Sequence, residues 1–208
     1  MVTKGRKREL AKDEWVTSTL SLWQWIVDRK KIFYPLVSLI FLCGISYVAY
    51  LNFQQNQFIK ASETLIQAKS SEDYQKIIEK YSGTGSAAIA LKSLAQEAMV
   101  ENKWQEALNY LNQFSSEYQK HPLIQYIQIQ IGFCMEKLNK YGELDAFFDE
   151  LVQNYQSKPQ ETLILMSYAN SLFRRNQAQK ALLTYQKVIK FDDSVWKLEA
   201  EKRVQQLS

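Results

Sequence analysis

The sequence predicts an all-α protein with a single N-terminal membrane-spanning helix, followed by an α-solenoid that ends in a capping helix. Three observations lead to this prediction. The segment Ile32–Leu51 runs for twenty residues without one charged side chain. A helix–turn–helix pattern recurs at a constant spacing along the second half of the chain. The whole chain has only six glycines and three prolines, which favours long helices joined by short turns.

The segment Ile32–Leu51 has the length and composition of a transmembrane helix. At a rise of about 1.5 Å per residue it extends for about 30 Å, the thickness of the hydrocarbon core of a bilayer. No water is present there to satisfy backbone N–H and C=O groups, so the segment is expected to be helical. Pro35 lies in the first turn, where a missing N–H costs little. Aromatic residues flank both ends, as is typical of a membrane interface. They are Trp23, Trp25, Phe33, Tyr34, Tyr47, Tyr50 and Phe53.

Two other interpretations of this segment fit less well. A buried core helix of a soluble protein is usually shorter and carries at least one polar face. A cleaved signal peptide has an apolar core of roughly 7–15 residues followed by small residues at the cleavage site. Here the apolar core is longer, begins only at residue 32 and ends in YVAYLNF, which contains no such site. We therefore predict an uncleaved anchor.

The charge distribution predicts the orientation of this anchor. Residues 1–31 contain eight Lys and Arg against four Asp and Glu, an excess of +4 that equals the net charge of the chain. Residues 52–208 are therefore neutral overall. Because positive residues stay on the cytoplasmic side, we expect the N-terminus in the cytoplasm and residues 52–208 to be exported. The positive charge is local to the membrane, so it does not indicate nucleic-acid binding.

The cytoplasmic segment, residues 1–31, divides into two parts. Residues 1–12 are basic and polar, which predicts a disordered lead-in. From Asp13 to Asp28, apolar residues recur at three- and four-residue steps and predict one face of an amphipathic helix. This helix is expected to lie on the inner leaflet. An extension that contacts nothing, or that contacts a cytosolic partner, stays open as an alternative.

Two helices are expected between the anchor and the repeats. The first continues from Asn52 to Ala68, and the second runs from Ser71 to Tyr81 with a start signal at Ser71 and Glu72. The glycine cluster YSGTGS follows. It lacks the Gly-Lys-Ser/Thr of a phosphate-binding loop, so we interpret it as a helix stop at Gly83 and an N-cap at Ser86.

Three helix–turn–helix units follow in phase. Equivalent positions such as Ala107, Leu144 and Ala181 lie 37 residues apart. A unit repeated at constant spacing is typical of a solenoid. The first helices align as Leu91–x2–Leu94–Ala95–x2–Ala98, Gln128–x2–Ile131–Gly132–x2–Met135 and Leu165–x2–Tyr168–Ala169–x2–Leu172. The second helices align as Ala107–x3–Leu111–x2–Phe114, Leu144–x3–Phe148–x2–Leu151 and Ala181–x3–Tyr185–x2–Val188. The turns align as Asn102-Lys103-Trp104, Asn139-Lys140-Tyr141 and Asn176-Gln177-Ala178.

This pattern resembles the tetratricopeptide repeat, with three extra residues per unit. The small residues Ala95, Gly132 and Ala169 are expected to let paired helices approach closely. No unit has the leading Trp of that family, and Leu144 replaces a small residue of the second helix. Tyr74 and Ile77 fit the second helix of a degenerate first unit. A final helix, Val195–Leu207, with Asp192, Asp193 or Ser194 as its cap, is expected to close the open end of the solenoid.

The sequence contains no motif that indicates an enzyme, a metal site or a cofactor site. Neither a Cys/His metal spacing nor a nucleophile elbow is present. The single histidine, His121, precedes Pro122 in a turn and is expected to be solvated. Cys43 lies in the anchor and Cys134 in the exported domain, so no disulfide is expected. Cys134 is expected to be an inert packing residue. Asp145, Asp149 and Glu150 are expected to form a solvated helix face.

A protein-binding surface is therefore the expected functional feature. In tetratricopeptide solenoids the first helix of each unit lines a concave groove. Carried over to this chain, the resemblance implies a groove with an apolar centre rich in Met and aromatic residues, suited to unfolded or extended segments. The alternative that several of these residues belong to the core stays open. The expected groove residues are Ile89, Lys92, Gln96, Met99, Tyr126, Ile129, Phe133, Lys137, Leu163, Met166, Asn170, Phe173 and Arg174.

The order of segments resembles the YfgM-type ancillary subunits of the SecYEG translocon. Topology, size and repeat register over about residues 20–208 support the resemblance. It implies a single-pass protein of the bacterial inner membrane whose periplasmic domain helps the translocon. The partners that it implies are SecYEG, a PpiD-type membrane-anchored prolyl isomerase and emerging unfolded chains handed on to chaperones. The alternative is a tetratricopeptide scaffold for another envelope assembly, such as cell division or secretion machinery.

Overall fold

The computed structural model describes residue 27, residues 30–191 and residues 195–207. Within these residues the chain folds into nine helices and no strand, so the predicted all-α class is confirmed. The predicted helix over residues 13–28 and the predicted cap at residues 192–194 lie outside the described residues, apart from Val27. The helices are α2 (Lys30–Gln67), α3 (Ser71–Lys80), α4 (Gly85–Val100), α5 (Trp104–Glu117), α6 (Ile124–Lys137), α7 (Tyr141–Asn154), α8 (Glu161–Arg174), α9 (Ala178–Ile189) and α10 (Lys197–Leu207).

The chain forms two compact units, residues 1–56 and residues 57–208. Helix α2 contains the stretch Val37–Gln67, which among the described residues is the one helix long and apolar enough to span a membrane. The mean hydropathy of its most apolar window is 1.5, and no residue of that window is buried. Pro35 lies inside α2 without ending it, but α2 begins at Lys30, so Pro35 is the sixth residue of the helix and not, as predicted, part of its first turn. By length and composition α2 is therefore a candidate transmembrane helix.

The second unit begins with the last turns of α2. Ala61 of α2, Ile77 and Tyr81 of the α3 region and Ala90 of α4 are buried together in a small core. The first helix of the degenerate unit, which the repeat pattern did not identify, is therefore the end of α2. Helix α3 begins at Ser71 as predicted, but the residue that caps it is Ser70, which forms a capping box with Asp73.

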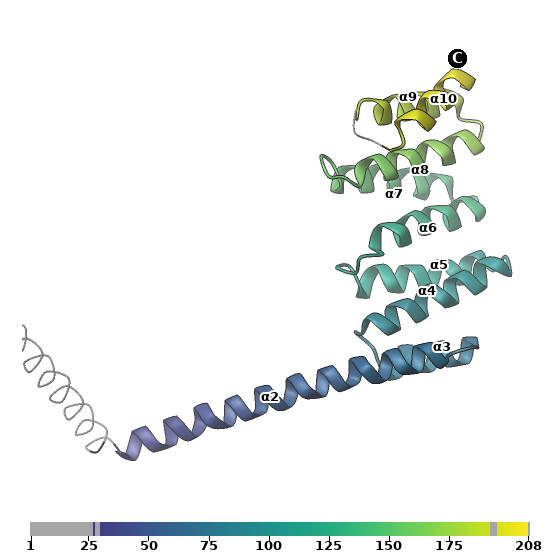
Figure 1. The fold of residues 1–208 in the computed structure, drawn as a ribbon. Coiled ribbons are helices and arrows are strands. Elements are labelled where there is room, and N and C mark those ends of the chain that lie inside the picture. The colour runs from purple at the N-terminus through teal and green to yellow at the C-terminus, as the bar shows by residue number, and fades with distance from the viewer. Residues whose placement is uncertain (1–26, 28–29, 192–194, 208) are drawn as a thin grey trace, which may run out of the picture. The chain divides into compact units, whose positions relative to one another are not determined.

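Helices α4 to α9 form the three predicted pairs, stacked in layers (Figure 1). Helix contacts run mainly between neighbours in the chain, with α6 also contacting α8, as in a solenoid. Asn102, Asn139 and Asn176 each end a first helix with a φ of 57–58°. After each asparagine, the next N–H donates to a carbonyl five residues back, for example Lys103 to Ala98 at 2.8 Å. The three turns are thus the same αL helix end, and asparagine tolerates that conformation well.

The small residue of the second unit is tightly enclosed. A Cβ added at Gly132 would lie 2.8 Å from two ring atoms of Phe148 and 3.5 Å from Leu144. Both neighbours are on α7, the paired helix, so the expected close approach of α6 and α7 is confirmed. Ala95 and Ala169, the equivalents of Gly132, are fully buried.

Two larger cores stabilise the solenoid. One contains buried residues of α4, α5 and α6, and the other contains buried residues of α7, α8, α9 and α10. Met135 and Phe147 pack against both. Helix α10 contributes Ala200 to the second core and contacts α9, so the predicted capping role is confirmed, although the helix begins at Lys197 rather than Val195.

Two predictions about turns were wrong. The N-cap of α4 is Thr84, whose side chain accepts a hydrogen bond from the Ala87 N–H, whereas Ser86 is buried and its hydroxyl contacts that of Ser62. Gly83 does adopt a positive φ of 77°, as a glycine in this turn can. His121 is not simply solvated. Its Nδ1 accepts a hydrogen bond from the Leu123 N–H, and its ring packs edge-on against Phe114.

Candidate functional site

The predicted groove residues lie on α4, α6 and α8, the first helices of the three units. Gln96, Tyr126, Lys137, Phe173 and Arg174 are exposed. The partly buried members are Ile89, Lys92, Met99, Ile129, Phe133, Leu163 and Asn170. These twelve residues are called the groove residues below. Together they form an accessible surface with aromatic and cationic side chains on α4, α6 and α8.

One predicted groove residue does not belong to this surface. Met166 is only 3% exposed and lies in the core shared by α7, α8, α9 and α10. It occupies the same repeat position as Lys92 and Ile129. Unlike those two partly buried residues, it is covered by neighbouring helices. An apolar side chain gains more free energy from full burial than from a place on a solvated surface. Met166 is therefore a packing residue.

Cations placed over aromatic rings connect neighbouring helices of the surface. The Lys92 Nζ of α4 lies 5.8 Å from the ring centre of Tyr126 on α6. Lys137 lies 5.3 Å from the ring of Phe133 and 5.7 Å from that of Trp104, and these two rings meet edge-to-face. Such contacts orient the aromatic rings while leaving part of each ring accessible.

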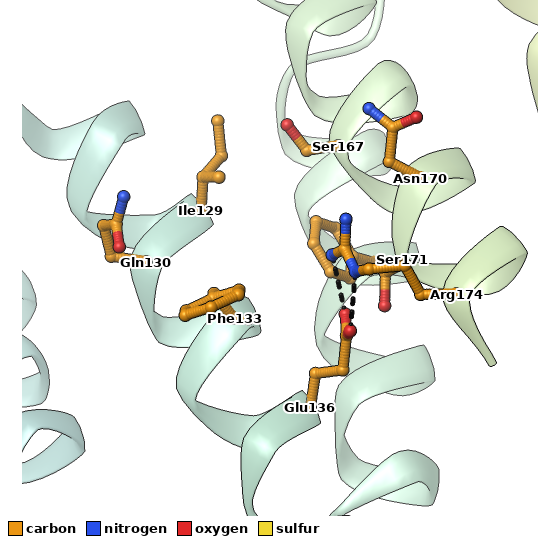
Figure 2. Close-up of a pocket in the computed structure, with 10 residues that line it drawn as sticks. Ile129, Gln130, Phe133, Glu136, Ser167, Asn170, Ser171 and Arg174 are labelled. Atoms are coloured by element: carbon orange, nitrogen blue, oxygen red, sulfur yellow. Dashed lines mark hydrogen bonds and ion pairs between the residues drawn. The ribbon is translucent and has the colours of Figure 1, made fainter. Parts of the chain in front are cut away.

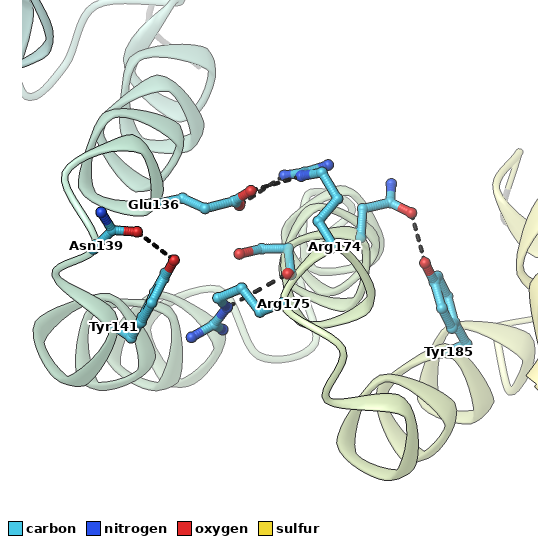
Figure 3. A network of polar contacts seen from close by, with 8 residues as sticks. Glu136, Asn139, Tyr141, Arg174, Arg175 and Tyr185 are labelled. Atoms are coloured by element: carbon cyan, nitrogen blue, oxygen red, sulfur yellow. Dashed lines mark hydrogen bonds and ion pairs between the residues drawn. The ribbon is translucent and has the colours of Figure 1, made fainter.

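A bidentate ion pair connects α6 to α8. Arg174 donates to both carboxylate oxygens of Glu136, at 2.7 and 2.8 Å (Figure 3). The Glu136 side chain is 11% exposed. Desolvation by burial raises the pKa of Glu136, but the hydrogen bond from Arg174 and the charges of Arg174 and Arg175 outweigh it, so this pKa lies below its usual value. Glu136 is thus an ionised carboxylate held in a fixed position.

The C-terminal part of the surface is also fixed by internal contacts. The Tyr185 hydroxyl of α9 donates to Asn170 Oδ1 at 2.6 Å (Figure 3). The Arg203 guanidinium of α10 lies 5.6 Å from the ring centre of Phe173. Asn170 and Arg174 therefore already have partners within the protein. This argues against a site in which these side chains hold the C-terminal carboxylate of a bound peptide.

A cavity of about 220 Å³ opens between α6 and α8 (Figure 2). Its apolar side consists of Ile129, Phe133 and the buried ring of Phe148 behind Gly132. Its polar side consists of Gln130, Glu136, Ser167, Asn170, Ser171 and Arg174. The Ser171 hydroxyl is buried and has no hydrogen-bond partner of normal geometry, although it lies near enough to Glu136 to help lower the pKa of that carboxyl.

Sequence reasoning missed several residues of this site. Glu136 lies 37 residues after Met99 and 37 before Phe173, so the repeat register alone identifies it. The predicted groove contains its neighbour Lys137 instead. Trp104 and Arg203 lie on a second helix and on the capping helix, where the pattern of first helices gives no signal. Ser167 and Ser171 are polar residues among apolar ones on α8, which is a weak signal by itself.

The described residues hold no group of three His, Cys, Asp or Glu side chains placed to bind a metal ion. Cys134 is fully buried, which confirms its expected place in the core, and burial raises the pKa of its thiol to about 11; that the thiol is inert stays a prediction. Asp145 is not merely part of a solvated face. It accepts a hydrogen bond at 2.6 Å from Arg175, whose side chain is 4% exposed.

No protein-family model and no curated protein matches the chain. The function proposed next therefore rests on the helices and side chains described above and on the resemblance noted in the sequence.

Proposed function

We propose that this protein is a membrane-anchored, non-enzymatic adaptor whose groove residues bind extended segments of partner proteins. Helix α2 supplies the anchor, and the solenoid of residues 57–208 supplies the binding surface. The single observation that carries the proposal is the row of accessible aromatic side chains along successive first helices, next to a cavity between α6 and α8. Exposed aromatic clusters of this kind mark protein interaction sites.

The charges of the surface support an apolar mode of recognition. Lys92 and Lys137 lie over aromatic rings, and Arg174 is engaged by Glu136. The charge of Arg174 is neutralised by that of Glu136, whereas Lys92 and Lys137 keep their charges, whose long-range attraction is screened by salt beyond about 10 Å. Residues 52–208 carry no net charge that steers a partner. Affinity is therefore expected to come mainly from Tyr126, Phe173 and the apolar side of the cavity.

The resemblance to YfgM-type ancillary subunits extends this proposal to the translocon. In that reading the anchor crosses the bacterial inner membrane with the N-terminus in the cytoplasm, and the groove faces the periplasm. The partners are SecYEG, a PpiD-type prolyl isomerase and unfolded exported chains. The alternative is a scaffold for another envelope assembly. Co-purification from solubilised membranes distinguishes the two, because only the first predicts enrichment of SecY.

Photo-crosslinking tests the groove with a matched pair of tyrosines. Tyr126 on α6 is 40% exposed and Tyr141 on α7 is 41% exposed, so the two sites differ in position rather than in accessibility. A photoreactive amino acid at position 126 should crosslink to a translocating chain or partner, and the same amino acid at position 141 should not. Equal crosslinking from both positions would refute a binding site on the first helices.

Alanine variants measure the contribution of the anchors. Tyr126→Ala and Phe173→Ala should each weaken binding about fivefold or more while helicity stays unchanged, because exposed aromatic side chains are typical hot spots. Phe133→Ala is a less selective test, since Phe133 also packs on Trp104. Normal crosslinking by folded Tyr126→Ala and Phe173→Ala variants would place partner binding elsewhere.

Cysteine labelling tests the orientation of the anchor. Lys158 is exposed in the turn between α7 and α8, so Lys158→Cys should react with a membrane-impermeant reagent added from outside. A cysteine within residues 1–12 should react only from the cytoplasmic side. The reverse pattern would overturn both the orientation and the periplasmic placement.

A further inference from the structure

The groove carries a local positive charge although the exported domain as a whole is neutral. Residues 52–208 contain equal numbers of acidic and basic side chains. The twelve groove residues, in contrast, include three cations, Lys92, Lys137 and Arg174, and no acid. The charge of Arg174 is compensated by Glu136 of α6. Among the described residues, the other two cations have no carboxylate partner.

Lys137 is the more available of these two cations. The Lys92 Nζ already donates a hydrogen bond to Gln96 Oε1 at 3.2 Å. Lys137 is exposed at the end of α6, and within the part of the chain that the structure describes its ammonium contacts only the rings of Phe133 and Trp104. An ammonium group has three N–H donors, and aromatic faces attract it without accepting all of them. Its remaining donors are therefore available to an anionic group.

Phe133 connects this ammonium to the cavity between α6 and α8. Its ring lines the cavity together with Ile129 and Phe148 (Figure 2). Lys137 does not line the cavity, but its Nζ lies 5.3 Å from the centre of the Phe133 ring. An extended peptide advances about 3.3 Å per residue, so this distance corresponds to one or two residues of a bound segment. An apolar side chain packed on Phe133 thus brings its neighbours in the segment within reach of the Lys137 ammonium.

We propose that Lys137 selects an acidic side chain, Asp or Glu, in the bound segment, one or two residues away from an apolar side chain that packs on Phe133. The carboxylate accepts a hydrogen bond from the Lys137 Nζ, which the two aromatic rings hold at the edge of the groove. This inference rests on the proposed function, because it specifies the chemistry of the extended segment. Apolar contacts supply most of the affinity, and the ion pair distinguishes between segments of similar hydrophobicity.

The size of the preference follows from the exposure of Lys137. Ion pairs between exposed side chains are weak, and a single pair changes an affinity by about 1.5-fold to fivefold. A basic residue at the same place in the segment would be repelled by the ammonium instead. Because salt screens exposed charges, the preference should shrink at about 1 M salt, where the Debye length is about 3 Å. The apolar contribution to binding should persist under those conditions.

The test uses the full chain in nanodiscs of zwitterionic lipid and three peptides that differ in one residue. The peptides share the core Xaa-Ser-Phe-Ser-Leu, with Asp, Asn or Lys at Xaa. Each is acetylated and amidated, so that no chain-terminal charge contributes, and carries an uncharged fluorophore. Fluorescence anisotropy measures the affinity at low salt. We expect affinity to fall in the order Asp, Asn, Lys, with the Asp peptide binding about 1.5-fold to fivefold more tightly than the Asn peptide.

Charge reversal separates a specific contact from general packing. Lys137→Glu should invert the order, so that the Lys peptide binds more tightly than the Asp peptide. Lys137→Gln removes only the charge and should abolish the preference for Asp over Asn. The matched control is Lys158→Glu. Lys158 is also exposed and its Nζ also lies 5.3 Å from a ring centre, that of Tyr155, but it is in the turn between α7 and α8 and outside the groove residues. Lys158→Glu should leave the order of the peptides unchanged.

The outcomes distinguish this inference from the proposed function. An unchanged order of the peptides in folded Lys137→Glu and Lys137→Gln variants would refute selection by Lys137. Inversion of the order in Lys158→Glu as well would show a general effect of charge and would likewise refute it. If the Asp and Asn peptides bind equally, or neither binds, while position 126 still crosslinks to a partner, the selection of an acidic residue fails and the adaptor function stands. If position 126 does not crosslink, the adaptor function itself fails.

Discussion

Gly132 is the position where a single methyl group should have the largest effect on the solenoid. A Cβ at this position would lie 2.8 Å from two ring atoms of Phe148, closer than side-chain carbons normally approach. Phe148 has little room to move away, because it is 2% exposed and stacked on Tyr168 at an interplanar angle of 14°. Gly132→Ala therefore forces α6 and α7 apart or drives the Phe148 ring out of its preferred position.

Two opposing free-energy terms decide the size of this effect. Overpacking of a core costs about 1–3 kcal/mol, while replacing glycine by alanine inside a helix gains about 1 kcal/mol. Gly132→Ala should therefore destabilise the protein by about 0–2 kcal/mol. Gly142 on α7 has no atom within 4 Å of an added Cβ, so Gly142→Ala should show only the helix-propensity gain. Gly132→Leu should be worse than Gly132→Ala because its side chain is larger.

Thermal unfolding of the full chain in detergent, followed by far-ultraviolet circular dichroism, measures the difference. A domain of this size changes its Tm by roughly 2–4 °C per kcal/mol, so Gly132→Ala should melt roughly 2–12 °C below Gly142→Ala. Adding Phe148→Leu to Gly132→Ala should recover part of the loss, since the clash is with that ring. If Gly132→Ala melts at the same temperature as Gly142→Ala, the close packing of α6 on α7 is wrong.

Three further predictions follow from individual contacts. Position 102 requires a positive φ, so Asn102→Gly should leave the Tm unchanged and Asn102→Ala should lower the free energy of unfolding by about 1 kcal/mol. The control is Asn109→Ala, which lies in a helix interior. Cys134 should react with iodoacetamide at pH 8 only when the protein unfolds, because a thiol with a pKa of about 11 is about one part in a thousand thiolate at that pH. Fast labelling of the native protein would contradict its burial. The pKa of Glu136 is lowered in the folded state, so its pairing with Arg174 stabilises the fold at pH values above the ordinary glutamate pKa of 4.5. This contribution disappears as the pH falls through the folded-state pKa. Glu136→Gln should therefore reduce the loss of Tm on acidification, and an identical pH profile of wild type and variant would show that the pair does not contribute.

The repeat architecture could be predicted from the sequence because it depends on local spacing. The constant interval places Asn102, Asn139 and Asn176 at the same helix end, and the structure gives them the same φ. The small residues of the first helices and the buried position of Cys134 were likewise predictable, since burial follows from a periodic apolar face. The sequence and the structure also agree on the all-α class and on the helical, apolar character of α2.

The features that were missed depend on contacts between units or on turns. The Glu136–Arg174 pair joins residues 38 positions apart, and its formation depends on how α6 and α8 are staggered, which periodicity does not specify. Met166 was misplaced because its exposure depends on neighbouring helices rather than on its repeat position. Thr84 rather than Ser86 caps α4. Both residues have a hydroxyl that suits an N-cap, so the sequence alone does not show at which of them the helix begins.

The place of the cavity follows from how the two cores meet. Buried residues of α6 belong to the first core and those of α7 to the second, so the boundary between the cores falls inside the second repeat unit rather than between units. Gly132 brings α7 close behind α6 at this boundary, and on the accessible side a space is left between α6 and α8. The Glu136–Arg174 pair joins the two helices at the edge of that space. A glycine that lets one side of α6 pack closely on α7 and an ion pair that links its other side to α8 therefore border the same cavity.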